Sequence, residues 1–318
     1  DIHERLVGSE MCIRDRFCDI IFAMNRKIDY KINENDTGKT VEGFLKERGY
    51  THQVLVRLKQ TDHGILRNGI WAYTNERLCK DDLITVQIVE NECSDNIAPV
   101  NLPLDIAYED DDIIVINKPF DMPAHPSAGN HDNTLANALM YYYGSQNKPF
   151  VYRCINRLDR DTTGLTIVAK HALAGGILGN AVAKRAIHRT YYAVCSGCTP
   201  ACMRISAPIA RKDASTIERC VDFKRGENAV TDFIRIKYNP DNNLSLVKLR
   251  LLTGRTHQIR VHMKYIGFPL IGDFLYNPDY TYISRQALHS GRLVFTHPVT
   301  GQKMNLISDI PSDMKSLF

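Results

Sequence analysis

The chain has 318 residues and a formal net charge of +4, enough for about two domains of ordinary size. Its 44% hydrophobic and 24% charged residues lie near the globular average, which excludes a disordered, collagen-like or coiled-coil protein. No stretch approaches the roughly 18 uncharged apolar residues of a membrane-spanning helix, so we expect no membrane span.

Residues 1–23 carry evenly mixed charges and no long apolar core, which is not the pattern of a signal peptide. The stretch LVGSEMCIRDR resembles a translated sequencing-adapter read-through. We therefore expect residues 1–23 to be a non-native leader and Met24 to be the native start. Without the three basic and five acidic residues of this segment, the remainder has a net charge of +6.

Residues 24–93 are predicted to form a compact module. Thr40–Arg48 has the apolar spacing of a short helix ended by Gly49, and Val54–Lys59 starts a second helix. The following segment, 63–90, predicts a strand, an Asn-Gly turn, a second strand, an acidic turn and a third strand. The module is therefore a helix pair packed on a hairpin.

This order of elements resembles the small RNA-binding domain first seen in ribosomal protein S-four. The matching positions are Gly64, Asn68, Gly69 and the turn at Asp82. The resemblance implies an RNA-binding module, although its charges nearly cancel and Asp81 stands where the family usually has glycine. A small cap without any ligand is the alternative.

A polar, proline-containing stretch without periodicity, 94–103, predicts a linker to a second domain over 104–318. That domain begins with a strand pair at 105–117, joined by an acidic turn. A loop rich in proline, histidine and glycine follows, and Thr134 caps a helix predicted over Leu135–Tyr143. Loops of this composition often border a cleft.

The segment NRLDRDTTG places one carboxylate, Asp159, between Arg157 and Arg160 on a turn that feeds a buried strand. Two flanking arginines would stabilise the charged form, and the turn could aim it at a cleft. This pattern predicts a candidate catalytic carboxylate. A purely structural acid–arginine turn is the alternative that the segment alone leaves open.

A second candidate site lies where the predicted strand SLVKLRLLT meets a helix. Thr256 is expected to cap that helix, and Gly267 to end it. Its apolar face would carry Ile259, Met263 and Ile266. Arg255 therefore sits at a strand-to-helix turn, which suits a phosphate or a partner carboxylate. A basic surface helix is the alternative.

The nine cysteines are an odd number, scattered through a chain far larger than a disulfide scaffold, which is typical of a reduced cytoplasmic protein. Cys195, Cys198 and Cys202 are close enough in sequence to suggest zinc or an iron–sulfur cluster. No fourth ligand stands at a usual spacing, and the first cysteine falls in a predicted strand. We expect no metal and no cofactor.

Several separated blocks together resemble an RluA-type RNA pseudouridine synthase over about 104–318. The blocks are VINKPFDMPAHPS, NRLDRDTTGLTIVAK, RTYYAV, LLTGRTHQIRVHMKYIGFPLIGD and RQALHS. The chain departs from the family pattern at Asn156, Thr163 and Arg189, where His, Ser and Lys are usual. The resemblance implies an α+β fold: the helix-pair module, then a mixed, largely antiparallel sheet with flanking helices and a central cleft.

The resemblance also implies roles for individual residues. Asp159 matches the catalytic aspartate, which acts as nucleophile or base at the sugar, and Arg255 matches the arginine that pairs with it. Tyr191 matches the tyrosine that stacks on the uracil and helps to remove the proton from carbon 5. Arg157 matches the arginine that fills the gap left by a flipped uridine. The residues expected to bind the substrate are Arg157, Lys118 and Arg260.

We therefore expect a cytoplasmic, monomeric enzyme that isomerises specific uridines in RNA to pseudouridine, with no membrane or protein partner. Large-subunit ribosomal RNA is the favoured substrate, and transfer RNA the other candidate. A non-catalytic RNA-binding or ribosome-assembly factor is one alternative. A base-excising glycosidase is another, but it needs a second carboxylate to activate water, and Asp161 is the only near candidate.

Overall fold

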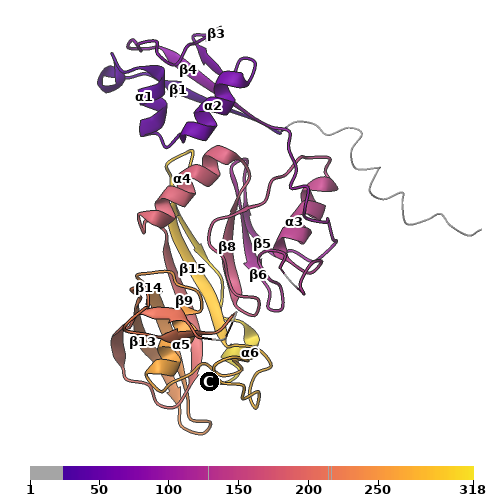
Figure 1. Ribbon diagram of the computed structural model, residues 1–318, viewed down its shortest axis with the longest axis vertical. Coiled ribbons are helices and arrows are strands. Elements are labelled where there is room, and N and C mark those ends of the chain that lie inside the picture. The colour runs from indigo at the N-terminus through magenta and orange to yellow at the C-terminus, as the bar shows by residue number, and fades with distance from the viewer. Residues whose placement is uncertain (1–23, 128, 214, 216) are drawn as a thin grey trace, which may run out of the picture. The chain divides into compact units, whose positions relative to one another are not determined.

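The computed structural model describes residues 24–127, 129–213, 215 and 217–318, so the predicted leader lies outside the described residues (Figure 1). The chain divides into two compact units. The first contains the residues up to Pro103 together with 126–153 and 170–176, and the second contains 104–125, 154–169 and 177–318. Within the described ranges, no helix has the length and apolar composition needed to cross a membrane.

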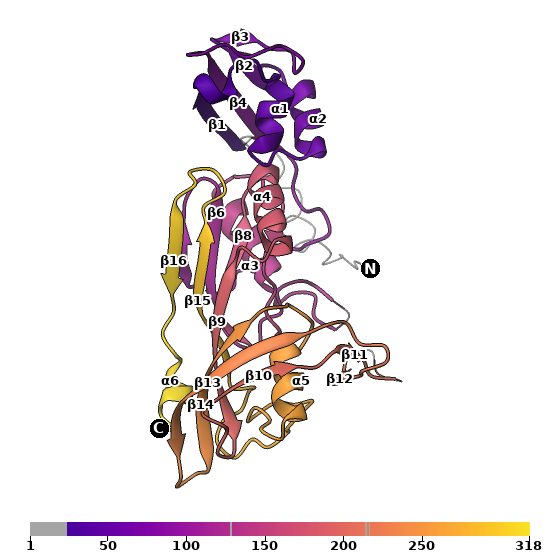
Figure 2. The same ribbon diagram turned by 90° about the vertical axis from the view of Figure 1, so that its left-hand side faces the viewer.

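The first unit holds a four-stranded antiparallel sheet in the order β1-β4-β2-β3 (Figure 2). Its strands are β1 (Met24–Lys31), β2 (Ile65–Arg67), β3 (Ile70–Trp71) and β4 (Leu83–Glu90). The predicted hairpin is confirmed, because Asn68 and Gly69 both have the positive φ that a two-residue hairpin turn requires. The edge strand β1 was not predicted, because it buries only Ile28 and so lacks an apolar alternation.

The helices of the first unit begin at threonine caps. They are α1 (Val41–Glu47), α2 (His52–Gln60) and α3 (Leu135–Gly144), after a short 3₁₀ turn at Glu34–Asp36. Thr40 and Thr51 cap the helix pair, and Thr134 forms a capping box with Asn137 at α3. The three predicted helices are thus confirmed, with ends that shift by one or two residues.

The stretch 94–103 has no helix or strand, as predicted, but hydrogen bonds fix it to the segment around α3. The hydroxyl of Ser94 accepts from the backbone N–H of Tyr152 at 3.1 Å, and Val100 N–H donates to the carbonyl of Asn137 at 3.1 Å. Asn137 Nδ2 donates in turn to the carbonyl of Ala98 at 2.7 Å. These bonds make 94–103 an ordered part of the first unit.

The second unit is built on a large mixed sheet in the order β10-β13-β14-β9-β15-β8-β6-β5, with β16 beside β15 and β7 beside β8 (Figures 1 and 2). Its strands are β5 (Ile106–Glu109), β6 (Ile113–Lys118), β7 (Arg153–Cys154), β8 (Thr163–Ala169), β9 (His188–Ser196), β10 (Cys202–Ser206), β13 (Val230–Asn239), β14 (Leu244–Leu251), β15 (Leu288–Thr296) and β16 (Lys303–Ile307). A separate hairpin pairs β11 (Ile209–Arg211) with β12 (Arg219–Val221).

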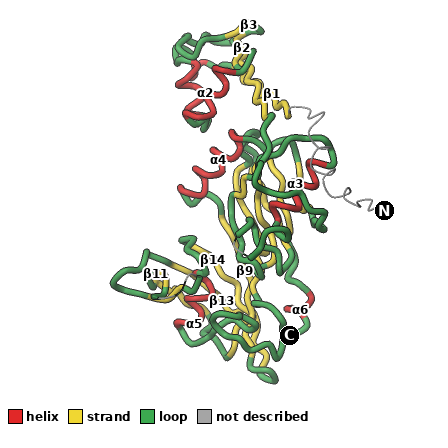
Figure 3. The backbone as a smooth tube through the Cα atoms, turned by 45° about the vertical axis from the view of Figure 1, so that its right-hand side comes forward, coloured by secondary structure: helices red, strands yellow, loops and turns green. Residues whose placement is uncertain are grey.

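Strands and loops dominate this unit, and its helices are short (Figure 3). They are α5 (Gln258–Tyr265) and α6 (Ser312–Lys315), while α4 (Ala172–Ala183) crosses the boundary between the units. The strand pair at 105–117 and the strand around β14 are confirmed. The fold is α+β with a mixed, largely antiparallel sheet, as predicted.

One contact in this sheet is parallel, where the start of β8 meets β15. Thr163 pairs with His289, and Gly164 pairs with Ser290. Gly164 has φ +107, and a Cβ on it would lie 2.3 Å from the carbonyl oxygen of Ser290. Only glycine fits this crossing, which fixes β8 directly after the turn that carries Asp159.

Gly164→Ala is expected to destabilise the protein by about 3 kcal/mol or more, because strain from the positive φ adds to overpacking against β15. Urea unfolding measures this loss. Gly301→Ala is the matched control, since Gly301 has φ +71 but nothing within 4 Å of the added carbon. Its loss should be about 1 kcal/mol, and equal losses in the two variants would contradict the close approach of the strands.

Candidate active site

The candidate carboxylate, Asp159, lies on the turn between β7 and β8. The carbonyl of Asp159 accepts from Thr162 N–H at 3.1 Å, which closes the turn. The buried Asn156 pins the start of the segment to β8: its Oδ1 accepts from Ile167 N–H at 2.8 Å, and its Nδ2 donates to the carbonyl of Leu165 at 3.2 Å. These hydrogen bonds hold the backbone of the turn in place, and the Asp159 side chain on it is 29% exposed.

Arg260 is the arginine that pairs with Asp159. Its Nη1 donates to Asp159 Oδ2 at 3.0 Å, while Nε and Nη2 bind the two oxygens of Asp273 at 2.7 Å each. Arg260 is 1% exposed and Asp273 is fully buried. Burial opposes the charge of Arg260, but the hydrogen bonds to Asp273 and the charge of Asp159 raise its pKa overall. A permanent positive charge therefore faces Asp159.

The expected pairing of Arg255 with Asp159 is wrong. Arg255 instead forms an ion pair with Glu227, and its Nε donates to the carbonyl of Asn228 at 3.2 Å. The reason is the geometry of the helix start. Arg255 precedes α5 on an exposed turn, whereas Arg260 lies on the helix face that points into the core.

The predicted cap of α5 is also wrong. Thr256 does not cap the helix; His257 takes the N-cap position with φ +57 and no side-chain capping bond. The apolar face of α5 is as predicted, because Ile259 and Met263 are buried in one core cluster and Ile266 packs against it.

A buried apolar cluster includes Leu158, the residue before the candidate carboxylate. Tyr191 on β9, Leu158 on the turn before β8 and Ile259 on α5 belong to one buried cluster. Tyr191 is 4% exposed, and its hydroxyl makes no hydrogen bond to any residue that the structure describes. Arg157 is exposed on the same turn and has no ion pair within the described ranges. The second unit thus holds a carboxylate braced by Arg260, a buried cluster that contains both the preceding residue Leu158 and Tyr191, and the exposed Arg157 two residues before the carboxylate.

Comparisons with known proteins identify the family. The family model described as RNA pseudouridylate synthase matches residues 112–265. The uncharacterized RNA pseudouridine synthase YjbO of Bacillus subtilis is 38% identical over 281 residues, which cover 88% of this chain and 98% of the relative. The chain belongs to the RluA-type RNA pseudouridine synthase family. The synthase is an isomerase that acts on uridine in RNA.

Other relatives of the synthase extend over most of its length. Ribosomal large subunit pseudouridine synthase D of Escherichia coli O6:H1 is 36% identical over 304 residues, covering 90% of this chain and 92% of the relative. Among solved structures, human RNA pseudouridylate synthase domain containing 1 superposes with a TM-score of 0.56 at 26% identity, covering 65% of this chain and 83% of the human one. The catalytic fold is therefore shared with a solved structure.

Lys118 does not lie where an RNA phosphate could reach it. The side chain is 1% exposed, and Nζ donates to the carbonyls of Pro119, Met122 and Arg160 at 2.7 to 2.8 Å. Nζ thus lies within hydrogen-bond distance of three carbonyl oxygens of the protein. The expected substrate-binding role is therefore wrong for Lys118, which ties the loop after β6 to the turn that carries Asp159. Arg260, the third expected substrate-binding residue, is also buried and binds Asp159 and Asp273.

Burial lowers the pKa of Lys118 to about 7, despite the opposing charges of Asp161 and Asp159. Between about pH 7 and its ordinary pKa of 10.5, this lysine is therefore protonated in the unfolded chain but not in the folded synthase. Because the unfolded state binds more protons, the contribution of Lys118 to the free energy of unfolding rises with pH across this window.

Lys118→Met should therefore flatten the rise in the free energy of unfolding between pH 7 and pH 10. It should also lower this free energy by about 2–4 kcal/mol at neutral pH, because three buried carbonyls lose their donor. Urea unfolding at several pH values measures both effects. Lys303→Met replaces an exposed lysine of β16 and should leave the slope unchanged. An unaltered slope in Lys118→Met would contradict the lowered pKa.

Two residues near Asp159 were not assigned a role from sequence, namely His257 and Tyr276. His257 Nε2 lies 3.8 Å from Asp159 Oδ2, and its Nδ1 is 3.0 Å from the Tyr276 hydroxyl. Burial lowers the pKa of His257 and raises the pKa of Tyr276 to about 12. His257 lies inside a quoted block, but no sequence pattern shows that Tyr276, 19 residues later, comes back to meet it.

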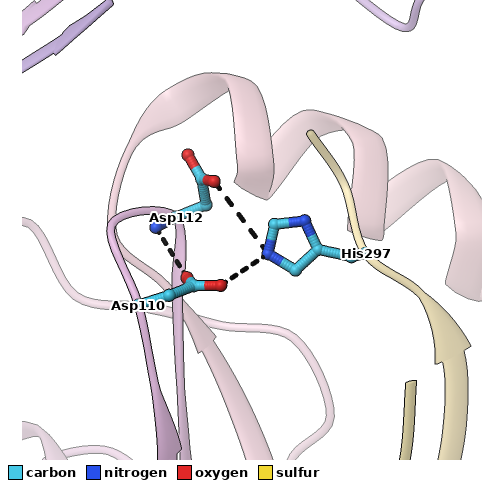
Figure 4. A group of neighbouring side chains, drawn as sticks. All are labelled: Asp110, Asp112 and His297. Carbon is cyan, nitrogen blue, oxygen red and sulfur yellow. Dashed lines mark hydrogen bonds and ion pairs between the residues drawn. The ribbon is translucent and has the colours of Figure 1, made fainter. Parts of the chain in front are cut away.

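A second cluster of polar side chains lies at Asp110, Asp112 and His297, where the turn between β5 and β6 meets the chain after β15 (Figure 4). His297 Nδ1 accepts from the backbone N–H groups of Val299 and Thr300, so Nε2 carries the proton and donates to Asp110 at 2.8 Å. A metal would need the lone pair of that Nε2, so these residues fit a metal poorly. Their hydrogen bond instead holds the turn between β5 and β6 to the chain after β15.

The three cysteines weighed as a metal site lie in different surroundings. Cys195 is fully buried in the core cluster, whereas Cys198 and Cys202 are exposed. Burial raises the pKa of the Cys195 thiol well above its usual value, which opposes a thiolate ligand. In the ranges that the structure describes, their sulfurs do not gather into a ligand set.

Proposed function

We propose that Asp159 is the catalytic carboxylate of the synthase and that the substrate is uridine in large-subunit ribosomal RNA. The observation that carries this proposal is the surroundings of Asp159. It is a partly exposed carboxylate on a fixed turn, held by the buried Arg260, and the preceding residue Leu158 belongs to the buried cluster that contains Tyr191. These surroundings orient the carboxylate through Arg260, and the neighbouring cluster would offer an apolar face to a planar base.

The reaction balances without an added reactant. The bond between N1 of uracil and C1′ of ribose breaks, and its electron pair leaves with the uracil. The base turns, and C5 forms a new bond to C1′. C5 gives up its proton and N1 gains one, so the product is an isomer. Asp159 acts at the sugar in this scheme, as nucleophile or as base, and regains its starting state in each turnover.

The remaining expected residues would have different roles. Tyr191 would stack on the uracil and, through its hydroxyl, help to remove the C5 proton. Arg157 would occupy the space that a flipped uridine leaves in the RNA, since it is exposed and has no partner in the described residues. Arg260 would act through Asp159 rather than on the substrate. Arg255, on its exposed turn, is left without a catalytic role.

We propose RNA binding for the module 24–93 through its hairpin. Many of its cations are already neutralised in ion pairs, such as Lys39 with Glu47 and Arg67 with Asp82. The hairpin around β3 exposes Ile70, Trp71 and Tyr73. Aromatic side chains of this kind stack on unpaired bases. The domain at 104–318 would carry the chemistry, with the synthase acting as a cytoplasmic monomer.

Large-subunit RNA is proposed because curated relatives bear the name ribosomal large subunit pseudouridine synthase. Mapping pseudouridine in ribosomal and transfer RNA from cells with and without the gene tests this substrate. We expect one or a few uridines of the large-subunit RNA to lose the modification and to regain it when the intact gene is restored. Loss confined to transfer RNA would overturn the proposed substrate but not the proposed chemistry.

A further inference from the structure

The two oxygens of the Asp159 carboxylate have different surroundings. Arg260 Nη1 donates to Oδ2 at 3.0 Å, and His257 Nε2 faces this same oxygen at 3.8 Å. The other oxygen, Oδ1, accepts no hydrogen bond from any residue that the structure describes. One oxygen is therefore held by the protein, and the other is available to a substrate.

The hydrogen bonds of Tyr276 determine which nitrogen of His257 carries the proton. The Tyr276 hydroxyl accepts from the backbone N–H of Arg219 at 2.9 Å, so its own proton can be donated to His257 Nδ1 at 3.0 Å. Nδ1 must then present a lone pair, and a neutral imidazole carries its proton on Nε2. The N–H group of His257 thus points toward Asp159.

The backbone at His257 adopts a conformation that costs conformational free energy. His257 has φ +57, a left-handed conformation that residues other than glycine rarely adopt and that recurs at functional sites. Its carbonyl accepts from Val261 N–H at 2.9 Å as α5 begins. The same short segment therefore directs both His257 and Arg260 to one carboxylate oxygen.

We propose that His257 and Tyr276 are positioning residues, which hold Oδ2 of Asp159 so that Oδ1 faces the ribose of the target uridine. This inference rests on the proposed catalytic role of Asp159. Tyr276 acts through His257, and His257 acts through Asp159, so neither residue needs to touch the RNA. The chain runs from Arg219 N–H through the Tyr276 hydroxyl and the imidazole to the carboxylate.

The charged groups that face His257 come from four parts of the second unit. They are Asp159 on the catalytic turn, Arg260 on α5, Asp273 on the loop after α5 and Arg219 on β12. The two acids and the two arginines oppose one another, and burial keeps the imidazole neutral. Without the Tyr276 hydroxyl, Nδ1 can take up a proton more easily, so the pKa of His257 should rise.

The test compares Tyr276→Phe, His257→Asn and the double variant in the full chain. Asparagine is chosen because it tolerates the left-handed conformation better than most residues. We expect each single variant to lose about 10-fold or more in kcat for tritium release from [5-³H]uridine RNA, with KM changed by less than about 3-fold. The double variant should lose little beyond either single variant, because both belong to one chain.

Two readouts separate positioning from packing. The acidic limb of the kcat–pH profile should move to higher pH in Tyr276→Phe, and ¹⁵N NMR should show the Nε2–H tautomer of His257 in the unmutated synthase. Tyr238→Phe is the matched control, since it removes a tyrosine hydroxyl that donates to Asn243 on the surface. It should leave kcat and the pH profile unchanged.

Additive losses in the double variant, an unmoved acidic limb in Tyr276→Phe, or the Nδ1–H tautomer would each overturn the positioning role. The NMR measurement does not depend on turnover. If the unmutated synthase released no tritium from any RNA, the proposed function would fail, whereas the tautomer and its dependence on Tyr276 would still be decided.

Discussion

Asp159→Asn is expected to abolish tritium release from [5-³H]uridine RNA, with a loss of about 10⁴-fold or more, while RNA binding changes by only a few-fold. The amide keeps the size of the side chain and can still accept the hydrogen bond from Arg260. It lacks the negative charge that a nucleophile or base at the sugar requires. Tritium release measures the chemical step, and a filter-binding titration measures affinity separately.

Asp161→Asn is the control for this experiment. Asp161 lies two residues away on the same turn, and its two oxygens accept from Arg160 Nε and Nη2 at 3.1 Å each. We expect this variant to keep activity within about 10-fold. Activity lost in Asp161→Asn but retained in Asp159→Asn would show that the catalytic carboxylate is misassigned.

Arg260→Lys is expected to give the second-largest effect, a loss of about 100-fold or more in kcat. One guanidinium group binds both oxygens of Asp273 and one oxygen of Asp159, and an ammonium group cannot reproduce this planar arrangement. Lysine is chosen because alanine would leave the fully buried Asp273 without a counter-charge, at a cost of about 3–5 kcal/mol in folding. Thermal unfolding shows whether the lysine variant is folded at the assay temperature.

Arg255→Ala is the contrasting variant. Its ion pair with Glu227 is exposed, and pairs of this kind contribute about 0–1 kcal/mol to stability. We expect kcat to stay within about 10-fold of the unmutated value and the melting temperature to stay nearly constant. If Arg255→Ala were as damaging as Arg260→Lys, the partner of Asp159 during turnover would be the arginine implied by the sequence motif.

The sequence predicted elements whose signals are local. Thr40 and Thr134 predict helix starts, and Asn68 and Gly69 predict a hairpin turn; the structure confirms each of them. These predictions succeed because caps and tight turns depend on a few neighbouring residues. The strand β1 escaped prediction because an edge strand with one buried side chain has no alternation to detect.

The candidate site could be predicted only in part. The motif placed an arginine opposite Asp159, but the choice between Arg255 and Arg260 depends on where α5 starts, and the left-handed His257 shifts that start past the expected Thr256. The predicted phosphate contact at Lys118 is wrong because the sequence shows that the residue is a lysine but not that it is buried among backbone carbonyls. Such burial comes from long-range packing.

The parallel crossing of β8 and β15 bears on how the synthase is made. Thr163 Oγ1 and His289 Nδ1 lie 2.9 Å apart across 126 positions of the chain, and Asp159 meets Arg260 across 101. A ribosome delivers residues in order, so the turn that carries Asp159 emerges long before β15, the strand that packs against β8. Each pair is separated by about a third of the polypeptide or more, so its partners can meet only late in synthesis, which favours slow, late assembly of this site.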